Sequence, residues 1–329
     1  MGICYRLKKI LANIVASFVW GDNLRRAVRG YILYSERFFK RYKPVDDNGK
    51  IFKHYLVFTA ICKNEAKNLP EWIEFHKLVG VEHFYIYDNG STDNTMEVLD
   101  SYIKDGIVTY IKYEGKKKQI PAYNDAVKRF KNETKWMGFI DIDEYVIPIS
   151  VDKISSFLKN FEGESGVFFN WVFYGDNDQK KREKGLIIER FTKHSAKMDS
   201  CGKLIVNPRC VSFMFVHVSY YKNNETSSDV CHNKLVFNYN PLPGDRHTNA
   251  KAMNIARINH YYFKSEEEWF SKIGRGDANA KDNVGRKNAL IKTWNNKYRI
   301  ECNEIEDIDA VKKYIPLIKK NLKERKIGI

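Results

Sequence analysis

The sequence predicts an α/β fold built on a mixed, largely parallel β-sheet. Apolar runs typical of buried strands alternate with helical patterns between residues 55 and 140, as in chains whose parallel strands are joined by helices. A polar segment directly follows three of these strands. Because ligands of such sheets bind at the carboxyl ends of the strands, we expect the three polar segments to meet in one crevice.

Length and composition are those of a globular protein. The chain has 329 residues, of which 43% are hydrophobic and 14% aromatic, enough for one elaborated domain or two fused lobes. Its formal net charge of +15 suits phosphates, anionic lipid headgroups or nucleic acid. The six cysteines are scattered without a CxxC pair, which disfavours a zinc site or a disulfide framework and favours a reducing cytoplasm.

Apolar spacing and turn residues place the elements of the first half. Apolar positions three or four apart predict a helix from 69 to 79, with Pro70 near its start and Gly80 at its end. The segment 88–93 combines a turn with a helix cap and leads into a second helix. The other expected elements are strands at 55–61, 84–87, 107–111 and 136–140 and a helix at 121–130.

The pattern becomes looser after Pro148. Aromatic, strand-like runs separated by polar loops occur at 166–174, 204–206 and 211–218. The chain ends in an expected helix whose apolar residues recur at helical spacing around Pro316: Val311, Ile315, Ile318 and Leu322.

The N-terminal segment joins basic residues to an apolar run. Arg6, Lys8 and Lys9 precede the run 10–20, which Asn13 interrupts and further Lys and Arg residues follow. The run is about half of the roughly 20 residues that span a bilayer and lacks a convincing cleavage site, so we expect no signal peptide. Two interpretations stay open: a helix that lies on an anionic membrane surface, and a helix that packs on the protein's own body.

Asp141 and Asp143 directly follow the apolar strand 136–140. Their spacing lets both carboxylates face the same side of an extended segment. Two such oxygen donors suit Mg²⁺ or Mn²⁺, and an ion held there would bridge a diphosphate. A lone DxD is more often an acidic surface turn, but a buried strand that runs up to it places the motif at a strand end.

Further polar residues sit at the other strand ends. Asp88 is placed for a contact with a base or ribose, whereas Asp93 fits the role of a helix cap. Lys63 and Lys203 could balance phosphate charge, as could the run 116–118, although a lysine run is usually a solvated face. Of these lysines we single out Lys203.

Several ordered segments resemble GT-A type glycosyltransferases, especially glycosyltransferase family 92 and its bacterial relatives. The first segments are 62–65 (CKNE), 71–76 (EWIEFH) and 88–93 (DNGSTD). The similarity continues through 136–145, 203–217 and 258–265 and covers about residues 56 to 276.

This resemblance implies a GT-A type, Rossmann-like mixed sheet and an inverting, metal-dependent transfer of a hexose. The donor would be a nucleoside-diphosphate sugar, with UDP as the expected nucleotide, and the acceptor a surface polysaccharide or lipid-linked glycan. It also adds His260 to the metal site, with His217 as the alternative histidine. We expect donor contacts from Lys63, Glu65, Asp88, Asp141 and Lys203, and Mn²⁺ or Mg²⁺ ligands from Asp141, Asp143 and His260.

An inverting transfer needs a base that takes the proton of the acceptor hydroxyl. Asp176 follows the aromatic strand 168–174 and could reach a sugar resting on Trp171 or Tyr174. Glu267 is the competitor, although its position also fits a helix-capping acid. We select Asp176 and keep Glu267 open.

The chain divides on this basis into four regions, with helical extensions at both ends of the GT-A domain. These are a basic amphipathic N-terminal helical region (1–50), a nucleotide-sugar-binding half (51–150), an acceptor-binding half (151–276) and a C-terminal helical tail (277–329). We expect the protein in the cytoplasm, peripheral on the inner face of the membrane.

Three rival functions fit the sequence less well. A nucleic-acid-binding protein would explain the charge, but the basic residues concentrate at the two ends and no such binding motif is present, so we expect no nucleic acid partner. A nucleotidyltransferase needs a phosphate-binding loop near its first strand, and 63–66 is a poor substitute. A protein of this fold that has lost catalysis is disfavoured by the intact Asp141 and Asp143.

Overall fold

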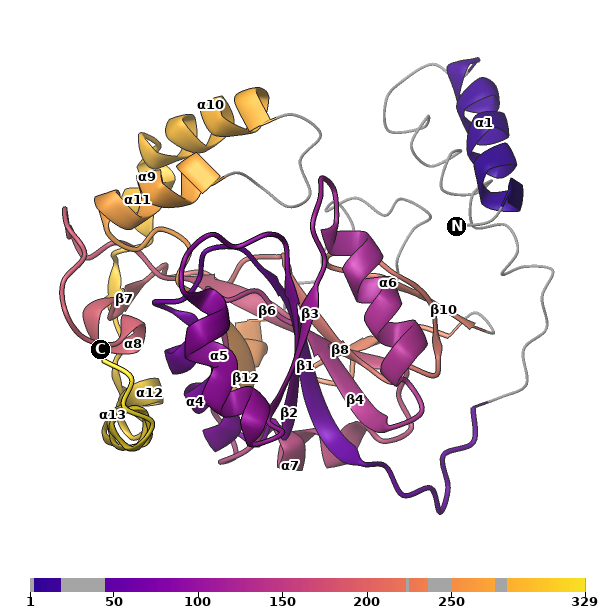
Figure 1. Ribbon diagram of the computed structural model, residues 1–329, viewed down its shortest axis with the longest axis horizontal. Helices are drawn as coiled ribbons and strands as arrows, with labels where there is room; N and C mark the ends of the chain where they lie inside the picture. Colours follow the sequence, from indigo (N-terminus) through magenta and orange to yellow (C-terminus); the bar gives the residue numbers. More distant parts are fainter. Residues whose placement is uncertain (1–2, 19–44, 223–224, 236–249, 276–282, 329) are drawn as a thin grey trace.

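The centre of the protein is a mixed β-sheet. The computed structural model describes residues 3–18, 45–222, 225–235, 250–275 and 283–328. Within these ranges, nine strands form one sheet in the order β3-β2-β1-β4-β8-β6-β12-β5, with β11 beside β6 (Figure 1). They are β1 (His54–Cys62), β2 (His83–Asp88), β3 (Val108–Lys112), β4 (Thr134–Phe139), β5 (Glu144–Pro148), β6 (Gly166–Phe173), β8 (Gly202–Val206), β11 (Ser228–Asp229) and β12 (Ala256–His260). The predicted α/β fold with a mixed sheet is confirmed.

The first half of the sheet is parallel, as predicted. Strand β1 pairs in parallel with β2 and β4, and β2 pairs in parallel with β3. The crossover helices are α4 (Leu69–Leu78), α5 (Thr95–Lys104) and α6 (Gln119–Phe130). The expected strands and helices of this half match these bounds to within about two residues.

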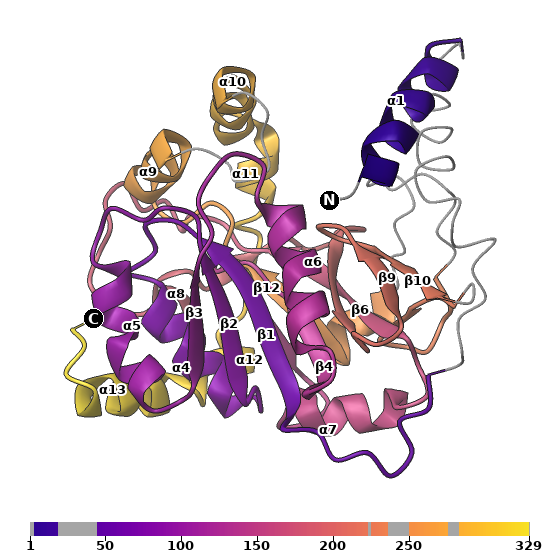
Figure 2. The same ribbon diagram turned by 45° about the vertical axis from the view of Figure 1, so that its right-hand side comes forward.

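The sheet is covered on both faces, which explains why β1 is apolar along most of its length. Alternate residues of β1 enter different cores: Phe58 packs in one cluster with α4 and α5, whereas Val57 packs in another with α6. Figure 2 shows α6 on one face of the sheet and α4 and α5 on the other.

The second half of the sheet is antiparallel in part. Strand β8 is antiparallel to β4 and β6, β12 is parallel to β6, and β5 is antiparallel to β12. The turn 140–143, called the acidic turn below, therefore connects two strands, β4 and β5, that are not neighbours in the sheet. The register places His260 of β12 opposite Glu144 of β5.

Helix α4 fixes the position of β5. The indole Nε1 of Trp72 donates to the carbonyl of Glu144 at 2.9 Å, and the backbone N–H of Val146 donates to Nε2 of His76 at 3.1 Å. Both side chains come from the segment 71–76, one of the segments that resemble the family. These two residues therefore hold the strand that follows the turn 140–143. Gly80 ends the helix region with φ +98°, as expected of a stop signal.

The remaining elements surround this sheet. They are α1 (Ile3–Ser17), α7 (Ile154–Leu158), η1 (Lys159–Phe161), α8 (Ile187–Arg190), β7 (Lys193–His194), β9 (Val211–Met214), β10 (Ser219–Tyr221), η3 (Ala250–Asn254), α9 (Glu266–Arg275), α10 (Asn283–Trp294), α11 (Lys297–Glu301), β13 (Ile305–Glu306), α12 (Asp309–Lys312) and α13 (Ile315–Glu324). The expected strand 211–218 is instead the hairpin β9–β10, whose chain reverses at residues 215–218.

The C-terminal region differs from the single helix expected around Pro316. Two helices, α12 and α13, are found there, and Pro316 lies in the first turn of α13, where its missing N–H costs no intrahelical bond. Helix α13 packs on α4, where Nε of Arg325 donates to Glu74 at 3.0 Å. The tail also adds strand β13, which pairs with β7, so it is part of the body of the protein.

The N-terminal region is described in two pieces. Helix α1 covers much of the apolar run, while the basic residues between 25 and 43 lie outside the described residues. The following loop is tied to the body because Asp47 accepts a hydrogen bond of 2.8 Å from Nε of Arg209. In the part of the chain that the structure covers, no helix is long and apolar enough to cross a membrane.

Candidate functional site

The polar segments that follow β1 and β2 are joined by hydrogen bonds. The backbone N–H of Asn64 donates to Oγ of Ser91 at 2.9 Å, and that of Thr92 donates to Oδ1 of Asn64 at 2.7 Å. Asp93 accepts from the N–H of Ala66 at 3.1 Å. The carboxyl ends of these two strands therefore form one continuous edge.

The carboxylate of Asp88 is used in contacts within this edge and is not exposed. It is buried, with Oδ1 accepting from the N–H of Ser91 at 2.8 Å and Oδ2 from the hydroxyl of Tyr110 at 2.5 Å. Asp93 accepts from the N–H of Thr95 at 3.1 Å, but the N-cap residue of α5 is Asn94 and no side chain caps this helix end. The predicted cap by Asp93 is therefore not formed, because the helix begins one residue later than a cap at Asp93 requires.

The two other predicted donor contacts in this region lie just beyond β1. Lys63 is half-buried. Glu65 is buried and accepts a hydrogen bond of 2.6 Å from Nδ2 of Asn68 at the start of α4. Glu65 also lies close enough to the buried Lys264 for their charges to interact.

Asp141 is held by three side chains. Its Oδ2 lies 2.7 Å from Nζ of Lys203, and its Oδ1 accepts from Nε2 of Gln119 at 3.2 Å and from the hydroxyl of Tyr123 at 3.1 Å. The Asp141 side chain keeps 31% of its exposure, whereas Lys203 has none. The lysine that we singled out from the sequence is thus a direct partner of the DxD motif.

Lys203 is positioned by the close pairing of β8 with β6. A Cβ on the preceding Gly202 would lie 1.9 Å from the carbonyl oxygen of Phe169, so only glycine allows this approach. Burial alone would lower the pKa of Lys203, but the carboxylates of Asp141 and Glu144 outweigh burial and raise it. The ammonium is therefore charged throughout the physiological range.

The side chain of Glu144 holds the backbone of the acidic turn. Its Oε2 accepts from the backbone N–H of Asp141 at 2.9 Å, and its Oε1 lies 3.9 Å from Nζ of Lys203. Burial raises the pKa of this carboxyl well above its ordinary value, against the effect of Lys203, and the carboxylates of Asp141 and Asp143 add to the rise.

Asp143 lies between a lysine and a histidine. Its Oδ2 is 2.6 Å from Nζ of Lys272, and its Oδ1 is 3.6 Å from Nε2 of His260. Burial would raise the pKa of Asp143, but Lys272 and His260 hold it well below its ordinary value. The carboxylate is therefore ionised at neutral pH.

His260 is enclosed by aromatic rings, with the ring of Trp171 at 4.7 Å and that of Phe173 at 4.9 Å. Burial lowers its pKa, which favours the neutral imidazole that metal binding requires. Its Nδ1 is buried and has no hydrogen-bond partner in the described part of the chain. The structure thus brings His260 to Asp143, as the resemblance implied.

The three predicted metal ligands do not form one cluster in this conformation. Among the described residues, no group of three His, Cys, Asp or Glu side chains is placed to hold a metal ion. The reason is local: Asp141 is directed to Lys203, whereas Asp143 faces His260 and Lys272. The ammonium of Lys272 occupies a position beside Asp143 that suits a cation.

His217 also lies at this site. Its Nδ1 is 3.0 Å from the carbonyl of Gly202, and its ring meets that of Trp171 edge-on at 5.2 Å. Burial, with the nearby Lys203 charge adding to it, lowers the pKa of His217 to about 3. Tyr174 is fully buried and its hydroxyl accepts from Asn259 at 2.9 Å, so it does not present a ring face to a sugar.

Asp176 is buried away from solvent, with its carboxylate held by the C-terminal region. Nδ2 of Asn303 donates to Oδ1 at 2.9 Å, and the guanidinium of Arg299 forms an ion pair with Oδ2. Glu267 is exposed and accepts from the backbone N–H of Arg182 at 2.8 Å. The capping box at the start of α9 uses Ser265 and the next acid along, Glu268, instead of Glu267.

Two lysines at the site were not selected from the sequence. Lys264 is buried between the charges of Glu65 and Asp143, and burial lowers its pKa. Lys272 reaches Asp143 from α9 and lies over the ring of Tyr262 at 4.4 Å. Helical spacing could have indicated Lys272, because it lies three residues after the buried Trp269 on the same face.

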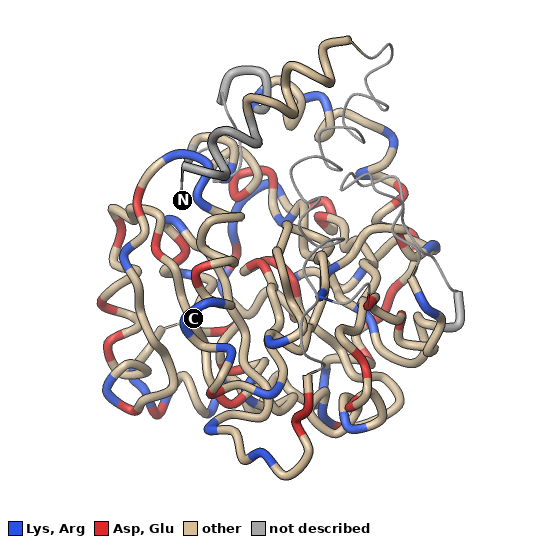
Figure 3. Tube along the Cα trace, turned by 90° about the vertical axis from the view of Figure 1, so that its right-hand side faces the viewer, with Lys and Arg blue, Asp and Glu red and all other residues tan. Residues whose placement is uncertain are grey.

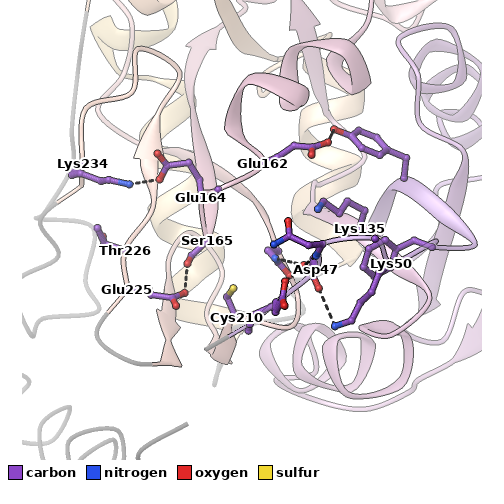
Figure 4. A pocket seen from close by; sticks show the side chains of 18 residues that line it. Asp47, Lys50, Lys135, Glu162, Glu164, Ser165, Cys210, Glu225, Thr226 and Lys234 are labelled. Carbon is purple, nitrogen blue, oxygen red and sulfur yellow. Dashed lines mark hydrogen bonds and ion pairs between the residues drawn. The ribbon is translucent and has the colours of Figure 1, made fainter. Parts of the chain in front are cut away.

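A cavity of about 980 Å³ lies at the opposite end of the sheet. Its lining includes Lys50 before β1, Lys135 at the start of β4 and Ser165 before β6, with Glu162 and Glu225 beside them (Figure 4). These positions are at the amino ends of the parallel strands. The acidic turn and its lysines are therefore a separate site from this cavity.

Curated proteins of one family are similar to this chain. A glycosyltransferase family 92 protein of Ricinus communis is 34% identical over 107 residues, which are 32% of this chain and 18% of that protein. Galactan beta-1,4-galactosyltransferase GALS2 of Arabidopsis thaliana is 27% identical over 180 residues, 49% of this chain and 34% of that protein. Beta-1,4-galactosyltransferase galt-1 of Caenorhabditis elegans is 29% identical over 117 residues, 32% of this chain and 26% of that protein.

These relatives are plant and animal proteins, so they do not support the bacterial type that the sequence suggested. The matched part of the chain spans about a fifth to a third of their length. Among solved structures, S. aureus TarS 1-349 is similar with a TM-score of 0.31 and 15% identity over 46% of this chain and 47% of that one. Mannosyltransferase PcManGT from Pyrobaculum calidifontis, in complex with GDP-Man and Mn²⁺, is similar with a TM-score of 0.30 and 14% identity over 48% of this chain and 47% of that one.

The family is shown by a longer match. The sequence model of glycosyltransferase family 92 matches residues 60–299, a range that contains the acidic turn, all three lysines around it and His260. The chain belongs to glycosyltransferase family 92.

Proposed function

We propose that this protein transfers a hexose, with galactose as the first candidate, from a UDP-linked sugar to a glycan or lipid-linked acceptor with inversion. The observation that carries the proposal is the acidic turn at the carboxyl edge of the sheet, with Asp141 and Asp143 paired to lysines. Galactose is the first candidate because two relatives are named as beta-1,4-galactosyltransferases.

The charges at the turn suit a diphosphate. Lys203 is fixed between Asp141 and Glu144 and offsets the negative charge of Asp141, from which it lies 2.7 Å away. Lys272 has a flexible stem and lies on the half-buried side of α9, so it can exchange the carboxylate of Asp143 for a phosphate oxygen. The buried Lys264 adds a second positive charge near Glu65 and Asp143.

The donor set fits Mn²⁺ or Mg²⁺. Asp143 and His260 would hold the ion, and Asp141, which faces Lys203 in this conformation, would have to turn toward them to become a third ligand. Carboxylates and an imidazole kept neutral by burial suit such an ion. The position of the Lys272 ammonium beside Asp143 supports a cation there. When bound, such an ion would neutralise the charge that develops on the departing diphosphate.

Asp176 stays our prediction for the catalytic base. Its contacts indicate the alternative, which is a structural role. In that role Asp176 anchors the loop after β6 to the C-terminal region, because Arg299 of helix α11 and Asn303 hold its carboxylate. We expect Asp176→Asn to lower the melting temperature because the ion pair with Arg299 is lost. A turnover reduced more than about tenfold at unchanged donor affinity would assign the base; near-normal turnover would exclude Asp176, and Glu267→Gln is then the variant to measure.

The proposal is tested by a donor screen. The purified chain is incubated with UDP-, GDP- and CMP-sugars in the presence of Mn²⁺ or Mg²⁺, and both binding and slow hydrolysis of each donor are measured. We expect UDP-galactose to bind and hydrolyse best. Absence of binding and hydrolysis for every donor would contradict the proposal, and salt-sensitive RNA binding in the same samples would favour the nucleic-acid alternative.

We also propose that the protein acts in the cytoplasm. The support is compositional: the six cysteines are scattered along the sequence without the paired spacing of a disulfide framework, as expected in a reducing compartment.

A further inference from the structure

Helix α1 carries an exposed apolar face. Its exposed large side chains recur at the spacing of one side of a helix. They are Ile10 (56% exposed), Leu11 (53%), Ile14 (52%) and Val15 (38%), and Phe18 (82%) directly follows the last helical residue. Ala12 and Ala16 are buried on the other side. The other exposed large apolar residues of the described chain are scattered singly over the body, so this helix is the place where they gather.

The segment around this face is strongly basic. Helix α1 contains Arg6, Lys8 and Lys9 and no acidic residue. The first 44 residues contain ten Lys and Arg against two Asp and Glu. A surface that combines apolar and basic residues is complementary to an anionic lipid bilayer, and two copies of such a segment repel each other.

The length of the helix decides between crossing a bilayer and lying on it. Its 15 residues extend about 22 Å at 1.5 Å per residue, short of the roughly 30 Å hydrocarbon core. Figure 1 shows α1 standing beside the sheet-and-helix body, away from β12. The helix is therefore suited to the interface, with its axis along the membrane plane.

We propose that helix α1 binds the headgroup region of an anionic bilayer through its apolar face. Ile14 and Phe18 insert among the acyl chains, and the positive charge of the N-terminal sequence favours an anionic surface over a neutral one. This attachment would bring the enzyme to a lipid-linked acceptor. It goes beyond the proposed transfer and does not depend on the identity of the donor.

The test uses the full chain and vesicles. Co-sedimentation is measured with phosphatidylcholine vesicles and with vesicles that also contain phosphatidylglycerol. We expect at least about tenfold tighter binding to the anionic vesicles, weakened by added salt. Ile14→Asp combined with Phe18→Asp should lower that binding by about tenfold or more, because two charges would enter the acyl region.

A matched control makes the same chemical change elsewhere. Met96 is 47% exposed on α5, and Met96→Asp should leave vesicle binding unchanged. Circular dichroism and the melting temperature check that all variants are folded. Equal binding to neutral and anionic vesicles, or unchanged binding of the double variant, would overturn the proposal. So would a dimeric mass in solution that the double variant reduces to one chain, since the face would then be an interface between copies.

Discussion

Two lysines at the acidic turn differ in how firmly they are held. Lys203 is enclosed by strands and pairs with two carboxylates, so it is a permanent part of the site. Lys272 reaches the turn from a helix and remains 21% exposed, with its ammonium 2.6 Å from Oδ2 of Asp143. We expect the first to maintain the site and the second to respond to ligands.

Replacing Lys272 tests this difference. Lys272→Met removes a positive charge 2.6 Å from Asp143, and a charge so close changes the affinity of a carboxylate for a cation by about tenfold or more. We expect Mn²⁺ to bind about tenfold tighter without donor, and UDP to bind several-fold weaker at saturating Mn²⁺. Titration calorimetry measures both affinities.

The control for Lys272→Met is Lys180→Met, which breaks the exposed pair with Glu266 at 3.1 Å near the start of the same helix. It should change neither affinity. Unchanged Mn²⁺ and UDP affinities in Lys272→Met would contradict the role assigned to this lysine, whereas absence of Mn²⁺ binding in the unmodified protein would contradict the metal-dependent function itself.

The residues of the site were predictable only in part. Asp141 and Asp143 follow an apolar strand, which places them at the edge of the sheet from local sequence alone. Lys264 and Lys272 are brought there by the long second half, where no local pattern specifies which strand pairs with which. For the same reason the contacts of Asp176 could not be foreseen, since Arg299 and Asn303 lie more than 120 residues away.

At the level of elements, the junction between α4 and β5 holds the acidic turn in place. His76 is wholly buried in this junction, with Nδ1 at 2.8 Å from the carbonyl of Trp72 and Nε2 accepting from the N–H of Val146. Burial lowers the pKa of His76 to about 3. The imidazole is therefore neutral in the folded protein at neutral and mildly acidic pH.

This neutral histidine makes stability depend on pH. The unfolded chain binds a proton at His76 below a pKa of about 6.5, whereas the folded chain does not until about 3. The stability contributed by the neutral form is thus complete above about pH 6.5 and is lost as the pH falls. From pH 7 to pH 5 this residue alone should lower the free energy of unfolding by about 2 kcal/mol.

Urea unfolding of His76→Gln at both pH values checks this contribution. The variant should be less stable at pH 7, because the bond to Val146 changes, but its loss of stability between pH 7 and pH 5 should be about 2 kcal/mol smaller than in the unmodified protein. An identical loss in the two proteins would show that His76 does not titrate in this way.

The helices and strands could be predicted where their buried residues follow a regular pattern. Strands β1, β2 and β4 are buried along most of their length, and helices α4 to α6 show regular apolar spacing, so both types stand out in the sequence. The second half was harder because its strands are short and pair across long separations, such as β5 with β12. The tail was taken as one helix because α12 and α13 share their apolar spacing across the break near Pro316.

The molecule as a whole combines a body in which basic and acidic residues are mixed with an N-terminal segment that is mainly basic. Figure 3 shows Lys and Arg interspersed with Asp and Glu along the trace of the body, while the first 44 residues hold ten basic and two acidic residues. This distribution explains why the net charge of +15 does not mark a nucleic-acid groove. It separates the two proposed contacts, a sugar nucleotide at the sheet edge and a lipid surface at α1.

The central claim is that the acidic turn of this family 92 protein binds a sugar nucleotide through a divalent cation. The most direct measurement is the hydrolysis of UDP-galactose with Mn²⁺, compared with the same reaction in excess chelator and with Asp143→Asn. The account predicts turnover that requires Mn²⁺ and falls by about a hundredfold or more in the variant, since the loss of one charge ligand removes several kcal/mol of transition-state stabilisation. Turnover that is equal with and without Mn²⁺, or unchanged in Asp143→Asn, would contradict it.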